Sequence, residues 1–145
     1  MPERDVLLAK AATIDRCIAR IEEVRARLQG LTALDRSEIV LLNLQRAAQA
    51  AIDLAAHVVS EEELPLPAET RDLFTTLASA GVVDASLTEA MRRMVGFRNL
   101  AVHEYREIDA RIVEAIVSQH LGELRAFAGV LLDRYGAGQR RAGTE

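Results

Sequence analysis

Cysteine, proline and aromatic residues are scarce in this sequence of 145 residues. Cys17 is the single cysteine, so no disulfide can form within the chain, which fits a reducing compartment such as the cytoplasm. Aromatic residues make up 3% of the chain and Trp is absent, so the core must be built from Leu, Ile, Val and Ala. Such a core suits packing between helices better than packing on a sheet. Three prolines and eight glycines leave room for long helices.

The sequence also lacks a strong positive charge and long uncharged hydrophobic runs. A net charge of −4 does not favour nonspecific nucleic-acid binding. No uncharged stretch approaches the ~20 residues that span a bilayer, and the charged residues Glu3, Arg4 and Asp5 argue against a signal peptide. There is no glycine-rich phosphate loop and no Cys/His cluster with metal-ligand spacing. We therefore expect a cytoplasmic protein with no membrane segment, no metal and no cofactor.

The residues that are present follow a helical pattern. Half of the chain is hydrophobic, and apolar residues recur in steps of three and four, which is typical of amphipathic helices. We expect five helices, over residues 3–29, 35–59 and 68–80, from residue 86 onward, and over 109–135. Long amphipathic helices with short connections predict an all-α antiparallel bundle. A single domain should cover 1–135, followed by a flexible polar tail over 136–145.

Start and stop signals support these ranges. Asp35 with Glu38, and Ser86 with Glu89, have the spacing of a capping box at a helix N-terminus. Asp109 is expected to cap the last helix. Further signals are Gly30 and Gly81 as helix ends, the small residues 47–51 as a place where a neighbouring helix can approach closely, and Pro65 and Pro67 as markers of a loop.

The histidines differ in their surroundings. His57 near a helix end is best interpreted as a boundary residue, and His120 on an apolar stripe as a core or interface residue. His103 lies in the segment 96–105, which reads GFRNLAVHEY. There Arg98, Asn99 and Tyr105 put a fixed cation, an amide and a phenol within eight residues of chain, at the expected junction between two helices.

This segment contains groups that RNA cleavage without a metal requires. A base must take the proton of the 2′-hydroxyl, an acid must protonate the leaving oxygen, and a cation should stabilise the charge on phosphorus. Histidine can serve as acid or base near neutral pH, and arginine fits phosphate oxygens. On a regular helix, however, Arg98 and His103 point about 140° apart. They converge only if the helix bends or ends near His103, or if a second subunit supplies one of them. Unrelated surface contacts are the alternative that geometry alone would favour.

The segment resembles the HepT-like toxins, a branch of the HEPN superfamily. Their signature is Arg, four residues, His, one residue and Tyr, with Asn commonly after the Arg, and here it is Arg98 to Tyr105. The flanking residues 94–97 and 108–109, the second-helix stretches 43–47 and 51–55, and residues 74–78 also resemble the family. Residues 91–111 contain five Arg against two Glu and one Asp, a local balance of +2 within an acidic chain.

The resemblance implies a homodimeric helical bundle whose two signature segments line a shared cleft. It implies that Arg98 and His103 are catalytic in metal-independent cleavage of RNA, either tRNA or mRNA, and that Asn99 orients the site or the phosphate. The protein would be the toxin of a toxin–antitoxin pair. The antitoxin partner would be an MNT-type nucleotidyltransferase that transfers AMP from ATP to Tyr105 and so silences the toxin. The added bulk and phosphate charge would obstruct an anion-binding cleft.

Two other classes of function are open to the same sequence. The chain could be a non-catalytic helical subunit that binds a nucleotidyltransferase or its substrate, an interpretation that suits the net charge of −4. It could also be a purely structural oligomeric bundle, although the concentration of Arg98, Asn99, His103 and Tyr105 disfavours this. Toxicity on expression that is lost with Arg98→Ala or His103→Ala would separate the ribonuclease from both.

Overall fold

The computed structural model describes residues 2–27, 29–104 and 109–136, and for residues 102–104 it describes the backbone alone. All regular structure in these ranges is helical, which confirms the expected all-α class. The elements are α1 (Arg4–Ala26), α2 (Ala33–Glu61), α3 (Asp72–Ser79), α4 (Ala85–Glu104), α5 (Ala110–Gln119), α6 (Leu121–Leu131) and a π-helical turn, η2 (Leu132–Gly136). None of these helices combines the length and the hydropathy needed to span a lipid bilayer.

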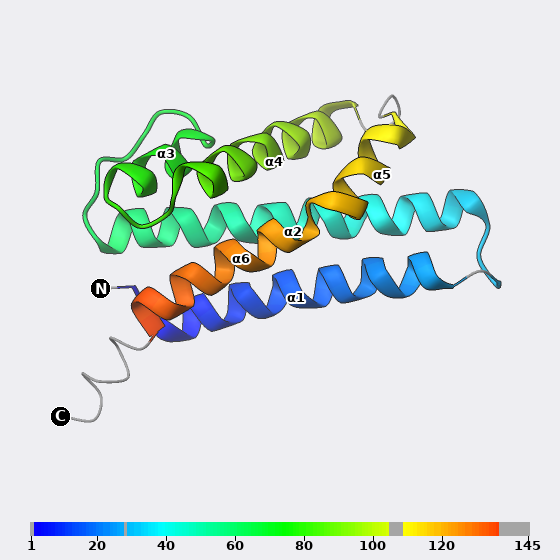
Figure 1. The fold of residues 1–145 in the computed structure, drawn as a ribbon, viewed down its shortest axis with the longest axis horizontal. Coiled ribbons are helices and arrows are strands. Elements are labelled where there is room, and N and C mark those ends of the chain that lie inside the picture. Colours follow the sequence, from blue (N-terminus) through cyan, green and yellow to red (C-terminus); the bar gives the residue numbers. More distant parts are fainter. Residues whose placement is uncertain (1, 28, 105–108, 137–145) are drawn as a thin grey trace.

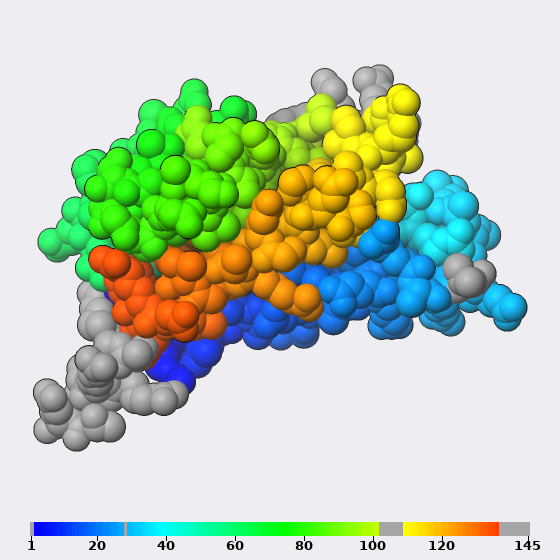
Figure 2. All heavy atoms as spheres, viewed as in Figure 1, coloured from blue at the N-terminus to red at the C-terminus, as the bar shows by residue number. Residues whose placement is uncertain are grey.

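Helix α2 is the central element of the bundle. It contacts α1, α3, α4 and α6, and the chain direction reverses between α1 and α2 and again between α2 and α4 (Figure 1). Helix α6 contacts α1, α2 and α4. In the space-filling view the atoms of α5 and α6 fill the band between α4 and α1 (Figure 2). The arrangement is therefore the antiparallel bundle that the periodicity predicted.

The core is aliphatic with a small aromatic centre. Phe74 of α3 and Phe127 of α6 meet edge to face with ring centroids 5.2 Å apart, a favoured aromatic geometry. On α2 the alanines of the stretch 47–51 are all buried, in agreement with the expected face of small residues. Cys17 is buried among the apolar residues of α1, where it packs as a small hydrophobic side chain.

The capping residues of two helices differ from those the sequence suggested. Helix α2 is capped by Thr32, whose Oγ1 accepts a hydrogen bond from the Asp35 backbone N–H at 2.9 Å, while the Asp35 carboxylate accepts one from the Thr32 N–H at 3.2 Å. Asp35 is thus the N3 residue of the box and not its N-cap. At α4, the Asp84 carboxylate accepts a bond from the Leu87 N–H at 2.7 Å, two residues before the expected Ser86. In each case a polar residue slightly upstream takes the cap and lengthens the helix.

The helix expected over 109–135 is interrupted. Asp109 does cap α5, its side chain accepting from the Arg111 N–H. At His120 the backbone takes φ −122° and ψ 0°, and α6 begins at the next residue in a new direction (Figure 1). The apolar spacing continues through the break, so periodicity could not reveal it. Gly122 lies two residues after His120 and has low helix propensity, which disfavours a single uninterrupted helix through this point.

Two smaller expectations also change. The third helix is shorter than expected because residues 69–73 form tight turns, with Asp72 and Leu73 donating to carbonyls three residues earlier. Helix α1 ends at Ala26, and Gly30 lies in the connection with φ +87°, a conformation that suits glycine. The tail expected at 136–145 lies outside the described residues, apart from Gly136.

Candidate functional site

The signature residues lie at the end of α4. Arg98 and Asn99 are in its last two turns, and the helix ends at Glu104, one residue after His103. Residues 105–108, which follow directly, lie outside the described residues. Tyr105 lies outside the described residues, and the side chain of His103 does as well.

Arg98 extends from the inner face of α4. Residues one or two turns away on the same face, Met91, Met94 and Ala101, are each at most 4% exposed. Arg98 itself is half-buried. Its Nε is the only buried side-chain nitrogen or oxygen without a hydrogen-bond partner in the part of the chain that the structure describes. The sequence suggested that the Arg98 side chain projects into a cleft. In the structure its Nε is instead buried, on the face of α4 that packs against the rest of the bundle.

An unpaired N–H of this kind is unusual, because nearly all buried polar groups in proteins are hydrogen-bonded. Leaving such a donor unsatisfied costs roughly 1–3 kcal/mol. An anion that accepts from Nε would recover that free energy, and guanidinium groups match the oxygens of phosphate. The half-buried guanidinium of Arg98 is thus a candidate phosphate-binding group.

Asn99 is also half-buried and is the next residue along α4. On an ideal helix it projects about 100° away from Arg98, and His103 about 140° away. A regular helix in one subunit would therefore place the three signature residues on different sides of α4. The amide of Asn99 can both donate and accept hydrogen bonds, so it can orient either an imidazole or a phosphate oxygen.

The other two histidines have local partners. The Nε2 of His57 accepts a hydrogen bond from the Glu3 backbone N–H at 3.0 Å, which fastens the start of α1 to α2. His57 is half-buried, and its interpretation as a boundary residue is confirmed. His120 is at the break between α5 and α6, with Nδ1 3.0 Å from Glu123 Oε1 and 37% of its side chain exposed. His120 therefore lies partly exposed at the break between α5 and α6 and is not part of a buried apolar stripe.

Two hollows lie on either side of α5. A cavity of about 330 Å³ is enclosed by α4, α5 and the start of α6, and its lining includes Phe97, Leu100 and His120. A larger, more open cavity of about 810 Å³ lies between α5 and the α1–α2 end of the bundle. In agreement with these hollows, only Val117 of α5 is buried. Neither cavity was predicted from the sequence. The one local signal for the smaller cavity was the i, i+3 spacing of His120 and Glu123 on either side of Gly122.

No group of three or more His, Cys, Asp or Glu side chains within the described ranges is arranged to hold a metal ion. Burial raises the pKa of the Cys17 thiol, an effect that nearby Arg46 and Arg16 partly oppose. This thiol is thus poorly suited to act as a nucleophile at neutral pH.

Comparison with known proteins identifies the family. Residues 14–131 match the family model described as ribonuclease HepT-like. The chain is 39% identical over 131 residues to the mRNA nuclease HepT of Shewanella oneidensis, covering 88% of this chain and 96% of the relative. The bundle with a cationic motif at a helix end is thus that of a ribonuclease. The chain belongs to the HepT-like ribonuclease family.

Solved structures agree with this assignment. The tri-AMPylated HEPN toxin of Shewanella oneidensis in complex with an MNT antitoxin superposes with a TM-score of 0.80 at 38% identity, covering 88% of this chain and 96% of that one. A toxin–antitoxin structure with AMP-PNP superposes with a TM-score of 0.79 at 37% identity, covering 88% and 98%. The family, the HEPN-type fold and the toxin class of ribonuclease inferred from the signature are confirmed.

Proposed function

We propose that this chain cleaves RNA in the cytoplasm without a metal ion, through Arg98 and His103, as the toxin of a toxin–antitoxin pair. The observation that carries the proposal is the buried Nε of Arg98 with no hydrogen-bond partner, on the helix whose backbone also includes His103. A phosphodiester supplies the acceptor that this donor lacks. The working unit is the helical domain over 1–135. Messenger RNA is the substrate we favour, because the relative from Shewanella oneidensis is an mRNA nuclease.

The proposed reaction is an internal transfer at phosphorus. A neutral imidazole of His103 takes the proton of the ribose 2′-hydroxyl, and the 2′-oxygen forms a bond to the adjacent phosphorus. The bond from phosphorus to the 5′-oxygen of the next nucleotide breaks, and that oxygen receives a proton. The products are a 2′,3′-cyclic phosphate and a 5′-hydroxyl end. Arg98 binds the phosphate oxygens as negative charge builds on them, and Asn99 orients the phosphate.

A homodimer completes this site. One subunit carries Arg98 and His103 on sides of α4 that diverge by about 140°, and each subunit contributes a single His103. Two α4 ends facing a shared cleft bring two imidazoles to one phosphate, so that one accepts a proton while the other, protonated, donates one. Chemical crosslinking and mass measurement in solution test the dimer independently of activity.

We propose that covalent modification of the chain controls this ribonuclease activity. An MNT-type nucleotidyltransferase binds the chain and transfers AMP to Tyr105: the phenol oxygen bonds to the α-phosphorus of ATP, and pyrophosphate leaves. The related Shewanella toxin is tri-AMPylated and in complex with an MNT antitoxin, and a related pair was crystallised with the ATP analogue AMP-PNP. Phosphates next to Arg98 would compete with RNA for the same cation.

One experiment tests the catalytic assignment. Purified wild type, Arg98→Ala and His103→Ala are assayed on single-stranded RNA in excess EDTA, and product ends are identified by mass spectrometry. Matched controls are Arg125→Ala, which removes an exposed arginine with only surface ion pairs, and His57→Ala. We expect cleavage by wild type and both controls, cyclic-phosphate ends, and at least a 10²-fold loss in both signature variants.

The same assay separates the alternatives. Full activity in a folded His103→Ala protein would refute its catalytic role, and activity abolished by EDTA would refute metal independence. Absence of cleavage by the wild type, with tight binding of the nucleotidyltransferase, would identify a non-catalytic partner subunit instead. For the modification, intact mass after incubation with ATP and the nucleotidyltransferase should rise by AMP units in wild type and not in Tyr105→Phe.

A further inference from the structure

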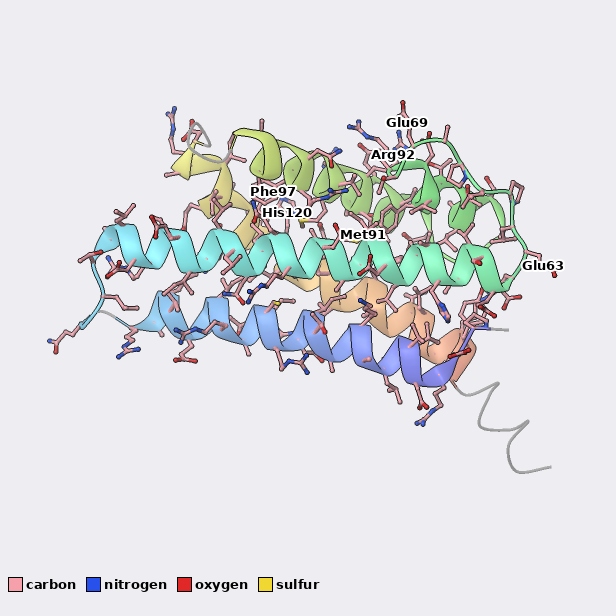
Figure 3. The ribbon with its side chains drawn as sticks, turned by 180° about the vertical axis from the view of Figure 1, so that it is seen from behind. Glu63, Glu69, Met91, Arg92, Phe97 and His120 are labelled. Atoms are coloured by element: carbon pink, nitrogen blue, oxygen red, sulfur yellow. The ribbon has the colours of Figure 1, made fainter. Side chains whose placement is uncertain are left out.

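The cavity between α4, α5 and α6 combines an apolar wall with one polar edge. Phe97 forms part of its buried wall at 6% exposure, while Leu100 and Ile112 stand at the mouth with 37% and 44% exposed. Figure 3 shows Phe97 and His120 next to each other between α4 and the α5–α6 break. The volume of about 330 Å³ is at the small end of ligand sites, which suits one planar ring system and not a long peptide.

The polar part of the lining consists of Arg93, which pairs with Glu89 at 3.4 Å, and of His120 and Glu123. The imidazole Nδ1 lies 3.0 Å from Glu123 Oε1, and because a carboxylate only accepts hydrogen bonds, Nδ1 carries the proton. This bond fixes the plane of the ring and leaves Glu123 Oε2 and His120 Nε2 for a ligand. The two side chains are 35% and 37% exposed, so they can be reached from solvent.

The cavity adjoins the proposed catalytic residues. Gly96, Phe97 and Leu100 line it, and they flank Arg98 and Asn99 in the sequence of α4. Leu100 precedes His103 by three residues, a rise of about 4.5 Å along the helix axis. A nucleotide next to the cleaved phosphate could therefore reach the cavity without leaving α4.

We propose that this cavity binds one unstacked nucleobase of the RNA substrate, and that Glu123 selects a base bearing an amino group. The inference rests on the proposed function and adds a specificity site to it. Proteins recognise single-stranded RNA by placing unstacked bases against apolar or aromatic side chains and hydrogen-bonding their edges. Phe97 and Leu100 contact the faces of the ring, and the carboxylate of Glu123 accepts from the amino group of adenine, cytosine or guanine. Uracil has no amino group, so it is disfavoured.

The test measures binding and cleavage separately. Binding uses short 2′-O-methyl RNAs, which lack the reactive hydroxyl, with one position changed among the four bases; cleavage uses the same sequences as ordinary RNA. We compare wild type with Glu123→Gln, whose amide both donates and accepts. The matched control is Glu114→Gln on α5, which removes a carboxylate that pairs at the surface with Arg25. Leu100→Trp blocks the mouth, and circular dichroism checks that each variant is folded.

We expect the wild type to prefer an amino-bearing base over uracil about tenfold at one position, as for one charge-assisted hydrogen bond. Glu123→Gln should lose this preference, Glu114→Gln should keep it, and Leu100→Trp should weaken binding of every sequence. Equal binding of all four bases by wild type, or an unchanged preference in Glu123→Gln, would overturn the inference. So would a Leu100→Trp protein that is altered only in self-association or in binding of the nucleotidyltransferase, since the cavity would then belong to a protein interface. Selective binding without cleavage would refute the proposed function and leave the cavity assignment supported.

Discussion

Replacing Arg98 by Met should stabilise the protein while abolishing its activity. The buried Nε has no hydrogen-bond partner, and an unsatisfied buried donor costs roughly 1–3 kcal/mol. Met keeps the unbranched chain among Met91, Met94 and Ala101 but removes the donor. Part of this gain in the free energy of unfolding is offset, because the variant also loses the solvation and the contacts of the terminal guanidinium nitrogens. We therefore expect the free energy of unfolding to rise by about 1 kcal/mol, equivalent to about 3 °C in Tm for a chain of this size.

The assay is urea unfolding followed by circular dichroism, at one fixed protein concentration because a homodimer is stabilised by mass action. Arg125→Met is the matched control: its guanidinium is 45% exposed, so its effect should stay within about 0.5 kcal/mol. Added inorganic phosphate provides a second readout. Each tenfold excess over its Kd should stabilise the wild type by about 1.4 kcal/mol and should not stabilise Arg98→Met.

Two results would refute this reasoning. An Arg98→Met protein destabilised by more than about 1 kcal/mol would mean that the guanidinium makes stabilising contacts within the protein, against the expectation for an unpaired donor. Equal stabilisation of wild type and variant by phosphate would mean that the anion binds elsewhere. A more stable, phosphate-insensitive and inactive variant would instead link the unpaired donor directly to substrate binding.

Three further predictions concern the scaffold. Thr32→Ala should lower the free energy of unfolding by about 1 kcal/mol, because it removes the acceptor for the Asp35 N–H, whereas Thr32→Ser should be nearly neutral in the same denaturation experiment. Hydrogen bonds from the side chain and backbone of Arg111 lower the pKa of Asp109, so this cap is present above the ordinary carboxyl pKa and is lost as pH falls through the lowered value. Protection factors, which are the intrinsic exchange rates at each pH divided by the observed rates, should fall at the start of α5 at acid pH in wild type and be insensitive to pH there in Asp109→Asn; equal pH dependence of the protection factors in both would exclude the cap as the cause. Cys17 should react with a thiol reagent only after unfolding, because it is buried and its pKa is raised; rapid labelling of the native protein would show that α1 opens locally.

The helix ends show where sequence patterns are ambiguous. Thr32, Asp35 and Glu38 are spaced so that either of two capping boxes can form, and at α4 either Asp84 or Ser86 can serve as the N-cap. Local spacing does not choose between them, because each alternative satisfies an equivalent set of backbone donors at its own helix start. Burial does not explain the choice at α2, since the added residue Leu34 is 67% exposed.

The sequence by itself determined the helical class, the order of the helices, the family and the candidate residues Arg98, Asn99, His103 and Tyr105. It could do so because helical periodicity and a short signature are both local along the chain. Only the tertiary structure decided the break at His120, the cavity that this break opens beside α4, and the burial of Arg98 Nε without a partner. These features arise from the packing of segments distant in sequence, where a continuous apolar stripe is compatible with either a straight or a broken helix.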